Sequence, residues 1–198
     1  MEYTYTGSAH EALVDAYAAD DERFRTGQRS AFPDRDAAIE EIGILRRLLF
    51  PGCWNGSDLV DDPEAVKETL DTLGQRLCHG IRPYASQCLA TAVTNILDQL
   101  PAIRQLLKCD VEAAYKGDPA AKSYVEIIRS YPGFHATMVH RLAHVIYEEG
   151  EGVFARELSE AAESVSEIDI HPGAELGEYF FSDHGSGVDI GATAEVGD

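Results

Sequence analysis

The stretch "DIHPGAELGEYFFSDHGSG", residues 169–187, has no helical periodicity, and it combines aspartate, histidine and glycine with three consecutive aromatic residues. It follows a long region in which apolar side chains recur at helical spacing. Such a change within one chain indicates a second type of structure near the C-terminus. The fold class therefore depends on what precedes this stretch and on what repeats within and after it.

The region before residue 167 predicts a series of amphipathic helices separated by proline and glycine. Pro63 and Pro101 stand where a proline can begin a helix but cannot continue one. The expected helical segments are residues 8–25, 34–52, 61–80, 86–100, 101–133 with a break at 117–119, 133–150 and 153–166. This pattern predicts a mainly helical body.

The segment 133–150 predicts one buried stripe and also carries three histidines. The stripe consists of Phe134, Met138, Leu142 and Val145, at spacings of 4, 4 and 3. His140 and His144 are four residues apart, which is the spacing of a two-histidine metal face, and His135 lies nearby. Because no acidic partner stretch accompanies them, we interpret all three as packing histidines and expect no metal.

From Ile168 onward the period changes to six. Aliphatic residues recur at Ile170, Leu176, Ile190 and Val196. The last three are each followed by a glycine, at positions 177, 191 and 197. The two pairs are offset by 14, which is two more than a multiple of six. Interrupted hexapeptide repeats of this kind are typical of a left-handed parallel β-helix. The predicted fold is a mainly α N-terminal helical domain, residues 1–166, followed by the first coils of a left-handed parallel β-helix, residues 167–198.

The charge excludes two classes of partner. With 16 Lys and Arg against 35 Asp and Glu, the formal charge is −19, which repels nucleic-acid phosphates and anionic membrane surfaces. The N-terminus has no signal-peptide pattern, and no apolar run is long enough to span a membrane. The four cysteines, Cys53, Cys78, Cys88 and Cys109, form no C-x-x-C pair and are expected to be reduced thiols. We therefore expect a cytoplasmic protein.

The stretch also carries a family resemblance. "DIHP" at 169–172 and "DHGSG" at 183–187, preceded by "KGDPAAKSY" and "YPGFHATMVHRLAH", resemble serine O-acetyltransferase, the acyltransferase family of cysteine biosynthesis. The resemblance runs from about Asp110 to Asp198. It implies L-serine as substrate and acetyl-CoA as co-substrate, with no bound cofactor. It also implies trimers that often pair through their helical domains.

The resemblance implies four site residues. A serine hydroxyl becomes a good nucleophile only when a base takes its proton, and histidine titrates near neutral pH. By resemblance, His184 is that base, and Asp169, 15 positions earlier, fixes its tautomer and stabilises the imidazolium. Asp118 and Asp183 are similar to the family's acidic residues that hold the ammonium group of the substrate. His171 is interpreted as structural.

Two departures from the family pattern bear on activity. The chain reads Gly191-Ala192-Thr193 where the family usually has G-E-T. It also ends at Asp198, after fewer than two coils, so the later residues that complete the family's site are not in this sequence. We therefore expect the 198-residue chain alone to be inactive. Two alternatives remain open: an acyltransferase with another amine-bearing acceptor, and a non-catalytic helical oligomerisation module.

Overall fold

The computed structural model describes residues 7–19, 35–55, 57–85 and 89–197. The chain divides into two compact units, Met1–Phe32 and Pro33–Asp198. In the first unit, helix α1 (Ala9–Ala19) has no buried residue along its described length. The expected helix over residues 8–25 is confirmed as far as residue 19, and residues 20–25 lie outside the described part.

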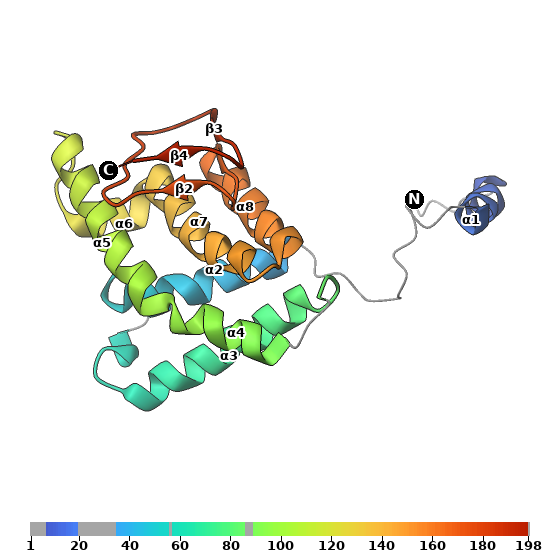
Figure 1. The fold of residues 1–198 in the computed structure, drawn as a ribbon, viewed down its shortest axis with the longest axis horizontal. Coiled ribbons are helices and arrows are strands. Elements are labelled where there is room, and N and C mark those ends of the chain that lie inside the picture. The colour runs from blue at the N-terminus through green and yellow to red at the C-terminus, as the bar shows by residue number, and fades with distance from the viewer. Residues whose placement is uncertain (1–6, 20–34, 56, 86–88, 198) are drawn as a thin grey trace, which may run out of the picture. The chain divides into compact units, whose positions relative to one another are not determined.

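The second unit contains the predicted series of helices (Figure 1). They are α2 (Arg35–Leu49), α3 (Pro63–Ile81), α4 (Leu89–Asp98), α5 (Leu100–Gly117), α6 (Tyr124–Ser130), α7 (Pro132–Glu148) and α8 (Gly152–Ser166), with short 3-10 turns η1 (Pro51–Cys53) and η2 (Ser57–Leu59). Asp62 caps α3 by accepting hydrogen bonds from the Glu64 and Ala65 amides, directly before Pro63 in the first turn. The predicted break at 117–119 separates α5 from α6.

Helix α7 lies at the centre of this unit because nearly all of its faces are covered. Its predicted stripe is confirmed: Phe134, Met138 and Leu142 are buried, and Val145 is half-buried against the same core. On the other side, α7 packs along α8, which contributes Phe154 and Leu158 to the core. A helix surrounded in this way holds its end residues in fixed positions, and those ends meet the C-terminal strands.

The C-terminal strands stack in parallel with a repeat of twenty residues. Strand β1 (Ile168–Ile170) pairs with β3 (Val188–Ile190), and β2 (Glu175–Leu176) pairs with β4 (Glu195–Val196). Ile170 lies beside Ile190, whereas an uninterrupted three-sided coil of hexapeptides repeats after about 18 residues. The two-residue offset in the sequence is therefore taken up between the paired strands, where residues 177–187 form a long connecting loop.

These strands rest on the helical body through a small apolar cluster of their own. Ile168, Ile170 and Ala174 are buried together with Ala136 of α7. Figure 1 shows the strands running over α7 and α8 on one side of the helices. Burial of these side chains stabilises the attachment, because about 25 cal/mol is gained for each Å² of apolar surface removed from water. The first coil is thus part of the same packed unit as α7.

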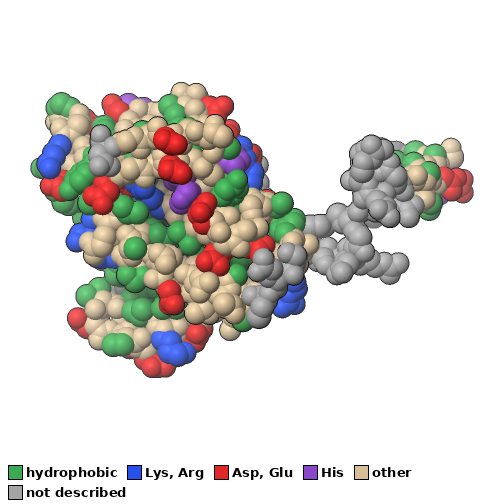
Figure 2. Space-filling view, in the orientation of Figure 1, with side chains coloured by type: hydrophobic (Ala, Val, Ile, Leu, Met, Phe, Trp, Pro, Cys, Tyr) green, Lys and Arg blue, Asp and Glu red, His purple; other side chains and the backbone are tan. Residues whose placement is uncertain are grey.

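The surface and the thiols agree with the sequence interpretation. On the face of this unit drawn in Figure 2, acidic side chains are scattered among apolar and uncharged ones. Cys53, Cys78 and Cys109 are free and half-buried, whereas Cys88 lies outside the described residues. Among the helices described here, none has the length and apolar character that crossing a membrane would need.

Glu41 of α2 gives the fold a testable pH dependence. It is buried, its Oε2 has no hydrogen-bond partner among the described residues, and burial raises the pKa of its carboxyl to about 7. A folded-state pKa above the unfolded value means that stability is present below about pH 4.5 and is lost as the pH rises to about 7. Glu41→Gln should therefore raise the free energy of unfolding by about 1–3 kcal/mol at pH 8 and change it little at pH 4.

Urea unfolding at the two pH values measures this difference. Glu148→Gln, at an exposed position on α7, is the matched control and should leave the free energy of unfolding nearly unchanged at both. Equal behaviour of the two variants at pH 8 would show that the buried carboxyl of Glu41 carries no penalty.

Candidate active site

The loop between β2 and β3 carries Asp183 and His184, and its backbone is unusual. His184 has a φ of 53°, and Gly185 follows with a φ of 73°. A Cβ atom at Gly185 would lie 2.6 Å from Cδ1 of Ile168, so only glycine fits there. The turn thereby directs the imidazole of His184 outward, and its side chain is 90% exposed.

A buried ion pair ties the start of this loop to the helices. Arg141 of α7 is paired with Asp110 of α5, with Nη2 at 3.1 Å from Oδ1, and both side chains are buried. The same guanidinium donates to the carbonyl oxygens of Leu176 and Gly177 at 2.6 Å each. Asp110 also accepts a hydrogen bond from the Phe180 amide at 2.9 Å. Burial raises the pKa of the Asp110 carboxyl, and the adjacent Arg141 charge opposes that rise.

Two glycines let the loop lie directly on the helices. A Cβ atom at Gly133, in the first turn of α7, would be 2.1 Å from the carbonyl oxygen of Ser182. A Cβ atom at Gly117, at the end of α5, would be 2.9 Å from the ring of Phe181. Real Cβ atoms do not approach backbone this closely. The residue just before Asp183 is therefore positioned by the N-terminal end of α7.

Asp118, Asp183 and His184 come together at this point. The Asp183 Oδ1 lies 3.7 Å from Nε2 of His184. Asp118 accepts hydrogen bonds from the Tyr131 hydroxyl and the Ala120 amide, and the Tyr131 bond is the main cause that lowers the pKa of its carboxyl. The charge of His184 lowers it further, and the same hydrogen bond raises the pKa of Tyr131 to about 12. The result is a pair of carboxylates beside an exposed imidazole, an arrangement that suits a cation.

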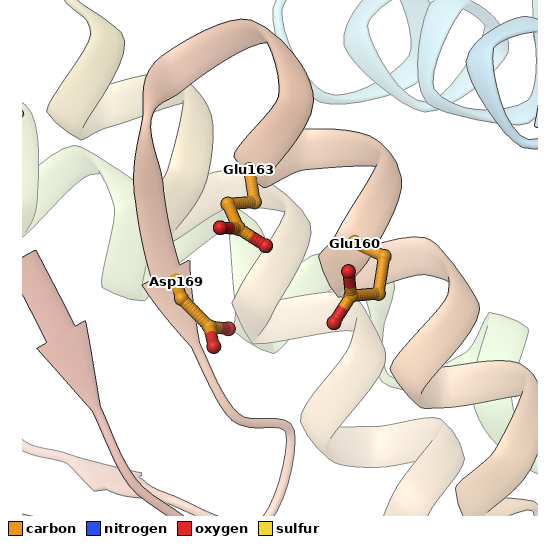
Figure 3. Close-up of side chains that lie close together, drawn as sticks. All are labelled: Glu160, Glu163 and Asp169. Atoms are coloured by element: carbon orange, nitrogen blue, oxygen red, sulfur yellow. The ribbon is translucent and has the colours of Figure 1, made fainter. Parts of the chain in front are cut away.

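Asp169, the fourth predicted residue, makes its hydrogen bonds elsewhere in this chain. It lies on β1, and its two oxygens accept from Nη1 and Nη2 of Arg156 at 2.7 and 2.9 Å. Figure 3 shows its carboxylate facing Glu160 and Glu163 of α8. The three carboxylates have oxygens within 4.8 Å of one another, and Arg156, which also pairs with Glu160, supplies the positive charge between them. Within one chain, Asp169 and His184 are thus engaged with different partners.

The remaining predicted histidines have structural contacts. His171 accepts a hydrogen bond from the Gly173 amide through Nδ1, and His144 donates from Nδ1 to the Pro172 carbonyl at 2.8 Å. Burial lowers the pKa of His135 to about 4 and that of His140 to about 3, so both are neutral at pH 7. These contacts confirm the packing interpretation of the α7 histidines and the structural interpretation of His171.

Sequence reasoning missed Asp110, Arg141, Tyr131 and Arg156. One signal was available for Arg141: it follows a buried position within an apolar helix, where a charge requires a partner. Nothing in the spacing indicated which residue that partner is, because Asp110 lies 31 positions away on another helix.

The fold combines a helical body with parallel strands that stack as successive coils, and the loop with Asp183 and His184 lies against the helices. It therefore belongs to the class of proteins in which a helical domain is followed by a coiled parallel β-structure. The family described as "Serine acetyltransferase, N-terminal" matches residues 60–138. A serine acetyltransferase of Synechococcus elongatus is 54% identical over 185 residues, which cover 84% of this chain and 58% of that relative. The chain belongs to the serine acetyltransferase family.

Solved structures give the same result. The native serine acetyltransferase 1 of Entamoeba histolytica is 37% identical with a TM-score of 0.75, covering 96% of this chain and 70% of that one. Isoform 3 from the same organism, solved in complex with cysteine, is 40% identical with a TM-score of 0.75, covering 94% and 65%. The chain spans less than two thirds of the Synechococcus relative and of isoform 3.

Proposed function

We propose that this chain contributes the acceptor site and the base of a serine O-acetyltransferase, which transfers the acetyl group of acetyl-CoA to the hydroxyl of L-serine. The product, O-acetylserine, serves cysteine biosynthesis. The observation that carries the proposal is that Asp118, at the end of α5, lies close enough to the Asp183-His184 pair for the His184 charge to lower the pKa of its carboxyl. The cysteine bound to isoform 3 of Entamoeba histolytica supports an amino acid as ligand.

In the proposed reaction, His184 takes the proton from the serine hydroxyl while the oxygen attacks the thioester carbonyl. The carbon–sulfur bond then breaks, the acetyl group stays on the serine oxygen, and the coenzyme A thiolate leaves and takes the proton back from the imidazolium. The exposed position of His184 supports this role, because both substrates must reach its ring. No covalent enzyme intermediate is required.

Asp118 and Asp183 bind the serine ammonium in this proposal. Two carboxylates give an ammonium group charge-assisted hydrogen bonds, which are about twice as strong as neutral ones. Tyr131 positions Asp118, since its hydroxyl donates to Oδ2 and leaves Oδ1 close to the Ala120 amide. The lowered pKa keeps Asp118 ionised at neutral pH, as ammonium binding requires.

Asp169 stabilises the His184 imidazolium in the proposed mechanism. Its carboxylate is held by Arg156, so this role requires it to exchange that partner for the histidine ring. We further propose that the stacked coils form a left-handed β-helix beginning near residue 167, after the helical domain. We also propose that the protein assembles as trimers in the cytoplasm.

The acceptor site can be tested with a protein that can complete the reaction. This extended protein is the 198-residue chain followed by the residues that come after the matched region in the Synechococcus relative. In it, Asp118→Asn should raise the KM for L-serine about 10-fold or more, because a hydrogen bond to a charged group is lost. The KM for acetyl-CoA should change little. Release of coenzyme A thiol measures both constants.

The controls separate the alternatives. Asp71→Asn removes an exposed carboxylate on α3 and should leave both constants unchanged. 3-Hydroxypropionate, which is serine without its ammonium group, should be a poor acceptor. A panel of other compounds that carry both a hydroxyl and an amino group tests for a different natural acceptor. An extended protein that binds neither acetyl-CoA nor L-serine would favour the non-catalytic module. The 198-residue chain is assayed beside the extended protein and is expected to release no coenzyme A thiol.

A further inference from the structure

A cavity lies among α2, α6 and the first turn of α7, and it shares Tyr131 with the proposed acceptor site. Its volume is about 160 Å³, and its lining includes Arg46, Arg129, Tyr131, His135 and Met138. No aspartate or glutamate is among the described residues that line it. A lining with two arginines and no acid is unusual in a chain with 35 acidic residues against 16 basic ones.

Arg46 is held in place by neutral groups. Its Nη2 donates to Nδ1 of His135 at 2.6 Å, and its guanidinium lies 4.9 Å from the ring centroid of Trp54. His135 is neutral at pH 7, since burial lowers its pKa to about 4, and it therefore accepts this hydrogen bond. The guanidinium is half-buried, and this burial lowers its pKa, with no described carboxylate raising it.

Arg129 reaches the same ring from another helix. Its guanidinium lies 5.1 Å from the Trp54 ring centroid, and Nη1 donates to the Cys53 carbonyl at 2.6 Å. Three other arginines of this unit pair with carboxylates, namely Arg76 with Glu40, Arg141 with Asp110 and Arg156 with Asp169, whereas Arg104 resembles Arg129 in donating to a carbonyl oxygen, that of Leu49. Among the described residues, the two arginines of the cavity contact the Trp54 ring, a carbonyl oxygen and a neutral imidazole.

We propose that this cavity binds a small oxyanion, of the phosphate, sulfate or carboxylate type, between Arg46 and Arg129. A guanidinium has five N–H donors in a planar fork that matches the oxygen atoms of such anions. Among the described residues, each of these arginines uses one donor on a protein acceptor, which leaves donors for a ligand. The volume exceeds that of a few water molecules, each about 30 Å³, and accommodates a tetrahedral anion. The N-terminal end of α7, which begins at Pro132, adds a favourable partial charge.

The test is a calorimetric titration of the 198-residue chain with inorganic phosphate, sulfate and acetate at constant ionic strength set with chloride. The wild-type chain should bind at least one of these anions at one site. Arg46→Met and Arg129→Met should each weaken that affinity about 10-fold or more, because each removes a charged hydrogen-bond donor. Comparing the three anions distinguishes a tetrahedral oxyanion from a carboxylate.

Arg82→Met is the matched control, since it removes one exposed positive charge outside the cavity and should leave the affinity within about 2-fold. Arg129 is exposed, so its variant remains informative even if Arg46→Met does not fold. An affinity that all three variants lower equally, or that none lowers, overturns the proposal, as does a wild-type chain that binds none of the anions. The test needs no catalytic activity and is independent of the proposed reaction.

Discussion

Replacing Arg141 with methionine is expected to lower the free energy of unfolding by about 3–5 kcal/mol, the effect of removing one partner of a buried ion pair. The substitution leaves the buried carboxylate of Asp110 without its counter-charge. It also removes the donors that hold the carbonyl oxygens of Leu176 and Gly177. Urea unfolding at pH 7, followed by circular dichroism and by tryptophan fluorescence, measures the loss.

Lys67→Met provides the comparison, because Lys67 and Asp71 form an exposed ion pair. Exposed pairs contribute about 0–1 kcal/mol, so this variant should be nearly as stable as the wild type. A second comparison combines Arg141→Met with Asp110→Leu, which removes both charges and should recover part of the lost stability. If Arg141→Met and Lys67→Met were equally stable, the buried pair would not be what fastens the first coil to the helices.

In the extended protein, His184→Ala should lower turnover with L-serine by about 10²- to 10⁴-fold, the usual contribution of a positioned acid or base group. The free energy of unfolding should be nearly unchanged, because the imidazole is 90% exposed. Affinity for acetyl-CoA should change much less than turnover. Thiol release at saturating substrates gives the turnover number, and unfolding in urea gives the stability of the same preparation.

His79→Ala, at an exposed position in the last turn of α3, is the control for loss of a surface histidine and should retain full turnover. Asp169→Asn in the extended protein tests the proposed partner of the base and should reduce turnover through the wrong imidazole tautomer. Near-normal turnover of His184→Ala would assign the base to another group.

The helices and the strands could be predicted because their signals are local. Proline in a first turn and an apolar residue every third or fourth position mark α3 and α7, and the period of six marks the strands. The offset of two residues between the repeats also has a local cause, because the loop of residues 177–187 lies between them. Asp183 and His184 on that loop were identified by resemblance, and the structure places Asp118 near them.

What the sequence did not predict depends on contacts between distant segments. The pairing of Asp110 with Arg141 joins α5 to α7, and the pairing of Arg156 with Asp169 joins α8 to β1. Each of these charges alone is compatible with a solvated helix face. Tyr131 belongs to one of the family-like motifs of the sequence. The hydrogen bond from its hydroxyl to Asp118 forms only because the chain turns back between α5 and α7.

The close contacts of Gly117 and Gly133 with Phe181 and Ser182 limit how genes of this family can recombine. A crossover that takes the helices from one parent and the loop from another separates residues whose close approach leaves no room for a Cβ atom at Gly133 or Gly117. Hybrids should therefore retain their fold when the crossover falls after residue 187, because the glycines, the ion pair and the loop are then inherited together. Sequence exchange among relatives would accordingly be more frequent in the later coils than across α7 and this loop.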